Sequence, residues 1–128
     1  MQYDIEVKKS RKGGRGVFAL RNFKKGEVIE KCPILKLTVK ERNHCEKTML
    51  AHYMYPWRTL NDAAIVLGYG SIYNHLPKPE SNAKWIRDYT NLVMVYKAVA
   101  DIKKGEEILI DYNGDYEEDT IDWFTIKK

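Results

Sequence analysis

A turn containing two lysines and a glycine occurs twice in the sequence, 79 residues apart. Residues 19–29 read ALRNFKKGEVI and residues 98–108 read AVADIKKGEEI, so six of eleven positions are identical. Glycine permits a tight turn, and the flanking apolar positions are spaced to face a core. Two copies are too few for a solenoid, which needs about three repeats or more. The pattern predicts two related strand-turn-strand units in one compact body. Coincidence is the alternative, since such turns are common.

Short apolar segments separated by glycine and proline indicate a fold rich in strands. The segments with this character are 5–7, 17–19, 28–30, 33–39, 92–96 and 108–110. Residues 41–67 instead combine helix formers with irregular apolar spacing, and predict a short helix near 45–55 and a second helical piece near 61–67. We therefore expect a β-dominated α+β fold made of several short sheets with a small helical insert.

Length and composition exclude several classes of protein. The 128 residues suit a single domain covering 1–128. The composition, with 44% hydrophobic and 31% charged residues, excludes a disordered tail. The longest aliphatic run, 63–67, is far shorter than the roughly 18 residues of a membrane helix. No apolar signal core opens the chain, so we expect an intracellular protein. The spacing of two cysteines and three histidines predicts ordinary thiols and no metal site.

Charge is distributed unevenly along the chain. Residues 1–40 contain eleven lysines and arginines against four acidic residues, whereas residues 111–122 contain six acidic residues and no lysine or arginine. The basic part could face an anion and the acidic part a cationic partner. Two ordinary solvated surfaces explain the same pattern equally well.

Three segments combine glycines with side chains capable of chemistry. They read GGRGVFA at 13–19, LGYGSIYNH at 67–75 and GEEILIDYNGDY at 105–116. Taken singly, each has an ordinary structural explanation. The first could be a tight hairpin, the second could hold a hydrogen-bonded asparagine-histidine pair, and the third could place a tyrosine at the edge of a core.

Taken together, in this order and over this span, the segments resemble the SET domain, the fold of most protein-lysine methyltransferases. GGRGVFA is similar to the first motif of that family, YNH with Asn82-Ala83 to its NHS…PN motif, and GEEILIDY to its closing motif. The resemblance runs from about Ile5 to Tyr116 and is closest to compact stand-alone SET proteins of viruses and bacteria. It implies a β-clip-like fold with pseudoknot-like C-terminal threading. The implied parts are an N-terminal part at 1–40, the insert at 41–67, a C-terminal part at 68–116 and a final aromatic and acidic segment at 117–128.

The resemblance also implies S-adenosylmethionine as cofactor and a role for individual residues. Tyr112 would be the catalytic residue beside the transferred methyl group. The cofactor would be bound by Lys12, Gly14, Arg15, Gly16, Asn74, His75 and Tyr112. The channel for the substrate lysine would be lined by Tyr69, Tyr73, Ile110 and Tyr116. Ile110 occupies the position of the tyrosine/phenylalanine switch of the family, which leaves mono-, di- and trimethylation open.

The implied function is S-adenosylmethionine-dependent N-methylation of a lysine in a basic protein, such as a histone or histone-like tail. The acidic residues after Tyr112 could attract that substrate, and homodimerisation stays open. A non-enzymatic β-clip binding module is the first alternative. A nucleic-acid-binding domain ranks third, because the basic residues 1–40 come without a helix-turn-helix or an RNP-like aromatic motif.

Overall fold

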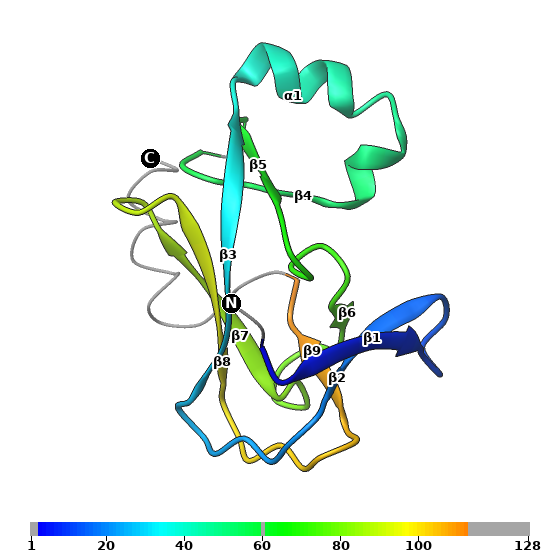
Figure 1. Cartoon of the computed structure of the whole chain (residues 1–128). Helices are drawn as coiled ribbons and strands as arrows, with labels where there is room; N and C mark the ends of the chain where they lie inside the picture. The colour runs from blue at the N-terminus through cyan, green and yellow to red at the C-terminus, as the bar shows by residue number, and fades with distance from the viewer. Residues whose placement is uncertain (1–2, 60, 113–128) are drawn as a thin grey trace.

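Strands dominate the computed structural model, which describes residues 3–59 and 61–112 (Figure 1). Its elements in chain order are β1 (Ile5–Lys9), β2 (Arg15–Ala19), β3 (Val28–Leu37), α1 (Val39–Cys45), the 3₁₀ helix η1 (Met49–His52), β4 (Met54–Tyr55), β5 (Ala63–Val66), β6 (Asn74–His75), β7 (Ala83–Asp88), β8 (Val93–Ala98) and β9 (Glu107–Ile110). The predicted β-dominated α+β fold is confirmed. Within the described residues, no helix is both long and apolar enough to cross a membrane.

The last strand of the described chain lies inside the sheet. The strand order is β1-β2-β9-β7-β8-β3-β5-β4, and β6 pairs with β9 outside this path. Strand β9 runs antiparallel to β2 but parallel to β6 and β7. Among the described strands, the N-terminal hairpin β1–β2 therefore pairs with the later strands through β9, which brings the three motif segments of the sequence to one region (Figure 1).

The two copies of the lysine-glycine turn pack against each other in a symmetrical arrangement. Phe23 and Ile102, which occupy equivalent positions, exchange two backbone hydrogen bonds of 2.8 Å, and both side chains are buried. The flanking bonds are matched as well, since Gly26 donates to Ala98 and Gly105 to Ala19, each at 2.8 Å. The repeat thus forms two related units in one body, as the sequence predicted.

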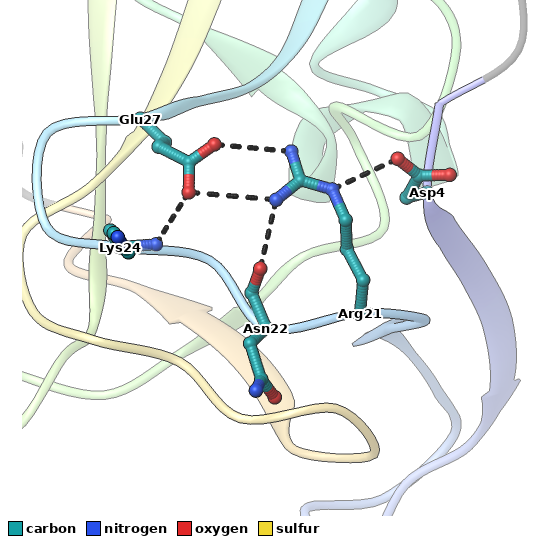
Figure 2. Close-up of polar contacts among 5 residues, drawn as sticks. All are labelled: Asp4, Arg21, Asn22, Lys24 and Glu27. Atoms are coloured by element: carbon teal, nitrogen blue, oxygen red, sulfur yellow. Dashed lines mark hydrogen bonds and ion pairs between the residues drawn. The ribbon is translucent and has the colours of Figure 1, made fainter.

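A polar network closes the first of these turns (Figure 2). The Glu27 carboxylate accepts hydrogen bonds from the Lys24 backbone N–H at 2.7 Å and from Arg21 Nη2 at 3.2 Å. Arg21 Nε also donates to Asp4 Oδ2 at 2.9 Å. The backbone bond from Lys24, followed by the guanidinium of Arg21, lowers the pKa of Glu27. The glutamate of the KKGE repeat thus has a structural role in the turn.

The helix predicted near 45–55 is wrong in position, because α1 covers Val39–Cys45 and only the short 3₁₀ helix Met49–His52 lies within 45–55. Helix α1 begins after Thr38, whose side chain accepts from the Glu41 N–H at 3.2 Å while Glu41 Oε1 accepts from the Thr38 N–H at 2.9 Å, which is a capping box. The helical piece predicted near 61–67 is wrong, because residues 63–66 form β5 between β3 and β4. Pairing on both sides buries Ala64 and overrides its preference for helix.

Strand β7 was not predicted from the sequence, although buried and partly exposed residues alternate regularly along it. Ala83, Trp85 and Arg87 are buried, and the residues between them are partly exposed. Arg87 lies over the Trp85 ring, with its guanidinium carbon 4.5 Å from the ring centroid, and donates from Nε to the Pro56 carbonyl at 3.0 Å. A buried arginine conceals the alternation, because an arginine normally marks the solvent side of a strand.

Candidate active site

A cavity of about 470 Å³ lies where the motif segments meet. Its lining comprises Gly13, Gly14, Arg15, His52, Tyr53, Ser71, Ile72, Asn74 and Tyr112. This volume falls within the range of about 300–1,000 Å³ that is typical of small-molecule sites. Because each of the three motif segments contributes residues to it, the cavity is the best candidate for a ligand site.

The glycine turn between β1 and β2 presents backbone to this cavity. Gly13 and Gly14 have φ angles of 107° and 60°, which side-chain-bearing residues adopt only with strain. Ser10 closes the turn, since its N–H donates to the Gly14 carbonyl at 2.9 Å and its Oγ accepts from the Lys12 N–H at 2.9 Å. Lys12 therefore belongs to the turn, but Lys12 is not among the residues that line the cavity.

Glu107 connects the glycine turn to the asparagine-histidine motif through hydrogen bonds. Its Oε1 accepts from Ser10 Oγ at 2.7 Å, and its Oε2 accepts from Asn74 Nδ2 at 2.8 Å. A Cβ atom on Gly16 would collide with this carboxylate, so the buried Gly16 makes room for it. Sequence reasoning missed this role of Glu107, although the residue is the second glutamate of the GEE motif.

Asn74 is held so that only one of its polar atoms is available to a ligand. Its Nδ2 donates both to the Arg15 carbonyl at 3.0 Å and to Glu107 Oε2 at 2.8 Å. Among the described residues, its Oδ1 accepts no hydrogen bond. Asn74 thus offers a carbonyl acceptor at the cavity wall, suited to an N–H donor of a ligand.

His75 positions the backbone of Tyr112. Its Nδ1 accepts the Tyr112 N–H at 3.0 Å, so the neutral ring carries its proton on Nε2. The two rings are also in contact, with centroids 4.9 Å apart. The parallel pairing of β6 with β9, which aligns His75 with Ile110, makes this contact possible.

Tyr112 lies at the junction of two cavities. It lines the cavity of about 470 Å³ and also a narrower one of about 90 Å³. Its hydroxyl donates to the Tyr73 carbonyl at 2.7 Å. Partial burial, followed by the proximity of Tyr53 and Glu107, raises the pKa of Tyr112, so its hydroxyl stays protonated at neutral pH.

The narrower cavity has mostly aromatic walls. It is lined by His52, Tyr53, Met54, Tyr55, Pro56, Ser71, Tyr73 and Tyr112. Tyr53 and Tyr55 were missed by sequence reasoning because a helix was expected near 45–55, whereas Tyr55 lies in β4. A cavity of this size and composition can surround an unbranched alkyl amine.

The structure does not bring every predicted site residue to these two cavities. Tyr73 lines the narrower one, but its hydroxyl points away and donates to Glu30 Oε1 at 2.8 Å. Tyr69 lines a separate cavity together with Glu30, and the Ile110 side chain is fully buried in the core. Tyr116 and the acidic segment 115–122 lie outside the described residues.

Comparison with known proteins decides the family. The model of the SET domain family matches residues 14–113. The chain belongs to the SET domain family. This SET domain is 34% identical over 113 residues to a histone-lysine N-methyltransferase, H3 lysine-37 specific, of Schizosaccharomyces pombe, covering 88% of the chain and 74% of that protein.

Two further comparisons agree with this assignment. The N-lysine methyltransferase KMT5A-A of Xenopus laevis is 32% identical over 122 residues, covering 85% of this chain but 36% of that longer protein. The crystal structure of a Plasmodium falciparum protein named as a putative histone methyltransferase superposes with a TM-score of 0.67 at 35% identity, covering 91% of this SET domain and 98% of that chain. None of these relatives supports a non-enzymatic β-clip module.

Proposed function

We propose that this SET domain is an S-adenosylmethionine-dependent protein-lysine N-methyltransferase whose two cavities take the two reactants. The cavity of about 470 Å³ would hold the cofactor, and the cavity of about 90 Å³ would admit the substrate lysine. The observation that carries this assignment is that the two cavities adjoin, with Tyr112 among the residues that line both. Family membership and the names of the relatives support lysine methylation as the reaction.

The residues around the larger cavity fit the proposed cofactor. The turn at Gly13 and Gly14 leaves open space where side chains would otherwise stand, since a Cβ on either would meet no atom within 4 Å. Asn74 Oδ1 offers an acceptor for the ammonium of the methionine part. When bound, S-adenosylmethionine supplies an electrophilic methyl group on a sulfonium. Arg15 would contact it directly, and Lys12, Gly16 and His75 would shape the surrounding backbone.

The narrower cavity suits a lysine that must react as a neutral amine. With an ordinary pKa near 10.4, deprotonating a lysine at pH 7.5 costs about 4 kcal/mol. Loss of water on burial in this cavity disfavours the ammonium form, and the sulfonium charge of a bound cofactor would have the same effect. The ammonium would lose its proton to water first, and the neutral nitrogen would then accept the methyl group that the bound cofactor supplies, giving a methylated ammonium and a neutral thioether.

Tyr112 would orient the reacting groups at the point where the cavities meet. Its hydroxyl proton is engaged by the Tyr73 carbonyl at 2.7 Å, so its oxygen presents lone pairs to the site. Those lone pairs can accept an amine N–H or weak C–H···O contacts from the methyl group. Positioning of this kind supplies much of the rate enhancement without a dedicated base.

The substrate is proposed to be a basic protein such as a histone. Two of the three relatives are named as histone methyltransferases. The acidic residues that follow Tyr112 could attract a basic tail. A histone substrate would place the protein inside a cell, in the nucleus of a eukaryotic host.

Transfer of label from isotope-labelled S-adenosylmethionine to a panel of basic proteins, core histones included, tests the proposal. Tyr112→Phe should lower kcat by about a hundredfold through misplacement of the reacting groups, while cofactor affinity changes less than threefold. Tyr89→Phe is the matched control, because Tyr89 lies outside both cavities and donates its hydroxyl to the Trp57 carbonyl at 3.1 Å. Absence of both label transfer and cofactor binding by calorimetry would overturn the proposal.

A further inference from the structure

Glu30 on β3 is a buried carboxylate to which the methyl-transfer chemistry assigns no role. Only 4% of the residue is exposed, whereas most glutamates lie at the surface. Removing a carboxylate from water is costly unless hydrogen bonds compensate for the lost solvation. The partners of Glu30 therefore indicate what the residue is for.

Two of its hydrogen bonds come from the segment 68–73, which leads into the asparagine-histidine motif, and a third joins Glu30 to the Cys32 thiol on the same strand. Tyr73 Oη donates to Glu30 Oε1 at 2.8 Å, and the Tyr69 N–H donates to Oε2 at 3.0 Å. Gly68 makes room for the carboxylate, since a Cβ there would lie 2.6 Å from Oε2. One side chain of β3 thus holds both ends of the segment.

The same segment supports the aromatic walls of the narrower cavity. The Tyr73 carbonyl accepts the Tyr112 hydroxyl at 2.7 Å, and the Gly70 carbonyl accepts the hydroxyls of Tyr55 at 2.8 Å and Tyr96 at 3.0 Å. The rings of Tyr73 and Tyr96 are stacked, with centroids 4.4 Å apart. A shift of the segment would therefore move the acceptor that orients Tyr112.

From this arrangement we infer that Glu30 is a positioning residue for methyl transfer. It acts through the Tyr73 hydroxyl and the Tyr69 backbone, and so fixes the carbonyl that orients the Tyr112 hydroxyl. The inference rests on the proposed function. It also explains why a glutamate occupies a buried position that would otherwise favour an apolar side chain.

Steady-state kinetics of Glu30 variants test the inference. Glu30→Leu should lower kcat at least tenfold, leave KM for S-adenosylmethionine within twofold, and change the ratio of mono- to higher-methylated product. Glu30→Gln should recover most of kcat, because its amide can place oxygen on the Tyr69 N–H and NH₂ on the Tyr73 oxygen. Glu27→Gln is the matched control, since Glu27 belongs to the exposed turn of Figure 2 and should leave kcat unchanged.

A second variant keeps the test valid if Glu30→Leu does not fold. Tyr73→Phe retains the stacked ring and removes only the bond to Glu30, so it should also lower kcat. The double variant Glu30→Gln with Tyr73→Phe should lose no more kcat than the more impaired single variant, because both substitutions alter the contact between residues 30 and 73. Wild-type kcat in both Glu30→Leu and Tyr73→Phe would overturn the inference.

Hydrogen exchange separates failure of this inference from failure of the proposed function. The Tyr69 amide should exchange at least tenfold faster in Glu30→Leu than in the wild type, whether or not methyl transfer is detected. If the wild type transfers no methyl group, the function is refuted while this readout still decides whether Glu30 holds the segment. Unchanged exchange at Tyr69 would contradict the role of Glu30 directly.

Discussion

Asn74 depends on Glu107 for its orientation, although the two residues belong to motifs 33 positions apart. An amide can present either its oxygen or its nitrogen, and the neighbouring groups decide which one. Glu107 and the Arg15 carbonyl are both acceptors, so they fix the nitrogen and leave the oxygen for a ligand. At this scale, binding chemistry depends on a residue that does not line the cavity.

Replacing Glu107 by glutamine should therefore weaken cofactor binding. The new amide would place an NH₂ group against the Ser10 hydroxyl or the Asn74 amide and would remove a charge-assisted hydrogen bond. Such a bond contributes about 1.5–3 kcal/mol, so we expect the Kd of the cofactor to rise roughly tenfold or more. Titration calorimetry with S-adenosylmethionine measures the effect. Glu106→Gln is the control, since Glu106 closes an exposed turn by accepting the Lys103 N–H at 2.6 Å. An unchanged Kd in Glu107→Gln would refute the role of Glu107.

The raised pKa of Tyr112 predicts how the rate depends on pH. A phenol is neutral below its pKa, so raising that pKa above the ordinary value of about 10 keeps the hydroxyl protonated throughout the alkaline range of the assay. Single-turnover rates at pH 7–9.5 should rise as the substrate lysine loses its proton, without a fall caused by Tyr112. A decline that begins below pH 9 and disappears in Tyr112→Phe would contradict this expectation.

Among the secondary-structure elements, α1 depends on its cap more than on burial. None of its seven residues is buried, so packing contributes little and the capping box at Thr38 contributes much of its local stability. The helix lies at one end of the molecule, apart from the β1–β2 hairpin (Figure 1). It connects β3 to the segment that supplies Tyr53 and Tyr55.

Thr38→Ala should lower the free energy of unfolding by about 1 kcal/mol, the usual cost of losing a threonine cap. Thr38→Ser keeps the hydroxyl and should restore most of that loss. Urea unfolding followed by circular dichroism measures both variants. Equal stability of the alanine variant and the wild type would show that α1 folds and unfolds apart from the rest of the domain.

For the molecule as a whole, the duplicated turn forms one side of the core. Phe23 and Ile102 are buried at equivalent positions of the two units, and their backbones are paired. Both side chains belong to the same buried hydrophobic cluster, so the two units contribute to one core. The stability of the whole domain therefore depends on this contact.

Phe23→Leu and Ile102→Val test this dependence with small changes in volume. We expect each to lower the free energy of unfolding by roughly 1 kcal/mol. Because the residues are neighbours, the loss in the double variant should differ from the sum of the two single losses. Leu20→Ala is the surface control and should change stability by less than about 0.5 kcal/mol. Additive effects measured by denaturant unfolding would argue against direct coupling between the two units.

The sequence alone determined the fold class, the two related units and the motif residues Asn74, His75 and Tyr112. Those features are local: glycines mark turns, alternation marks strands, and the motif letters are contiguous. Tertiary structure decided that residues 63–66 form a strand, that Tyr53 and Tyr55 line the narrower cavity, and that Tyr69 does not. It also gave Glu30 and Glu107 their partners, because a buried carboxylate is defined by what surrounds it, and its surroundings come from distant parts of the chain.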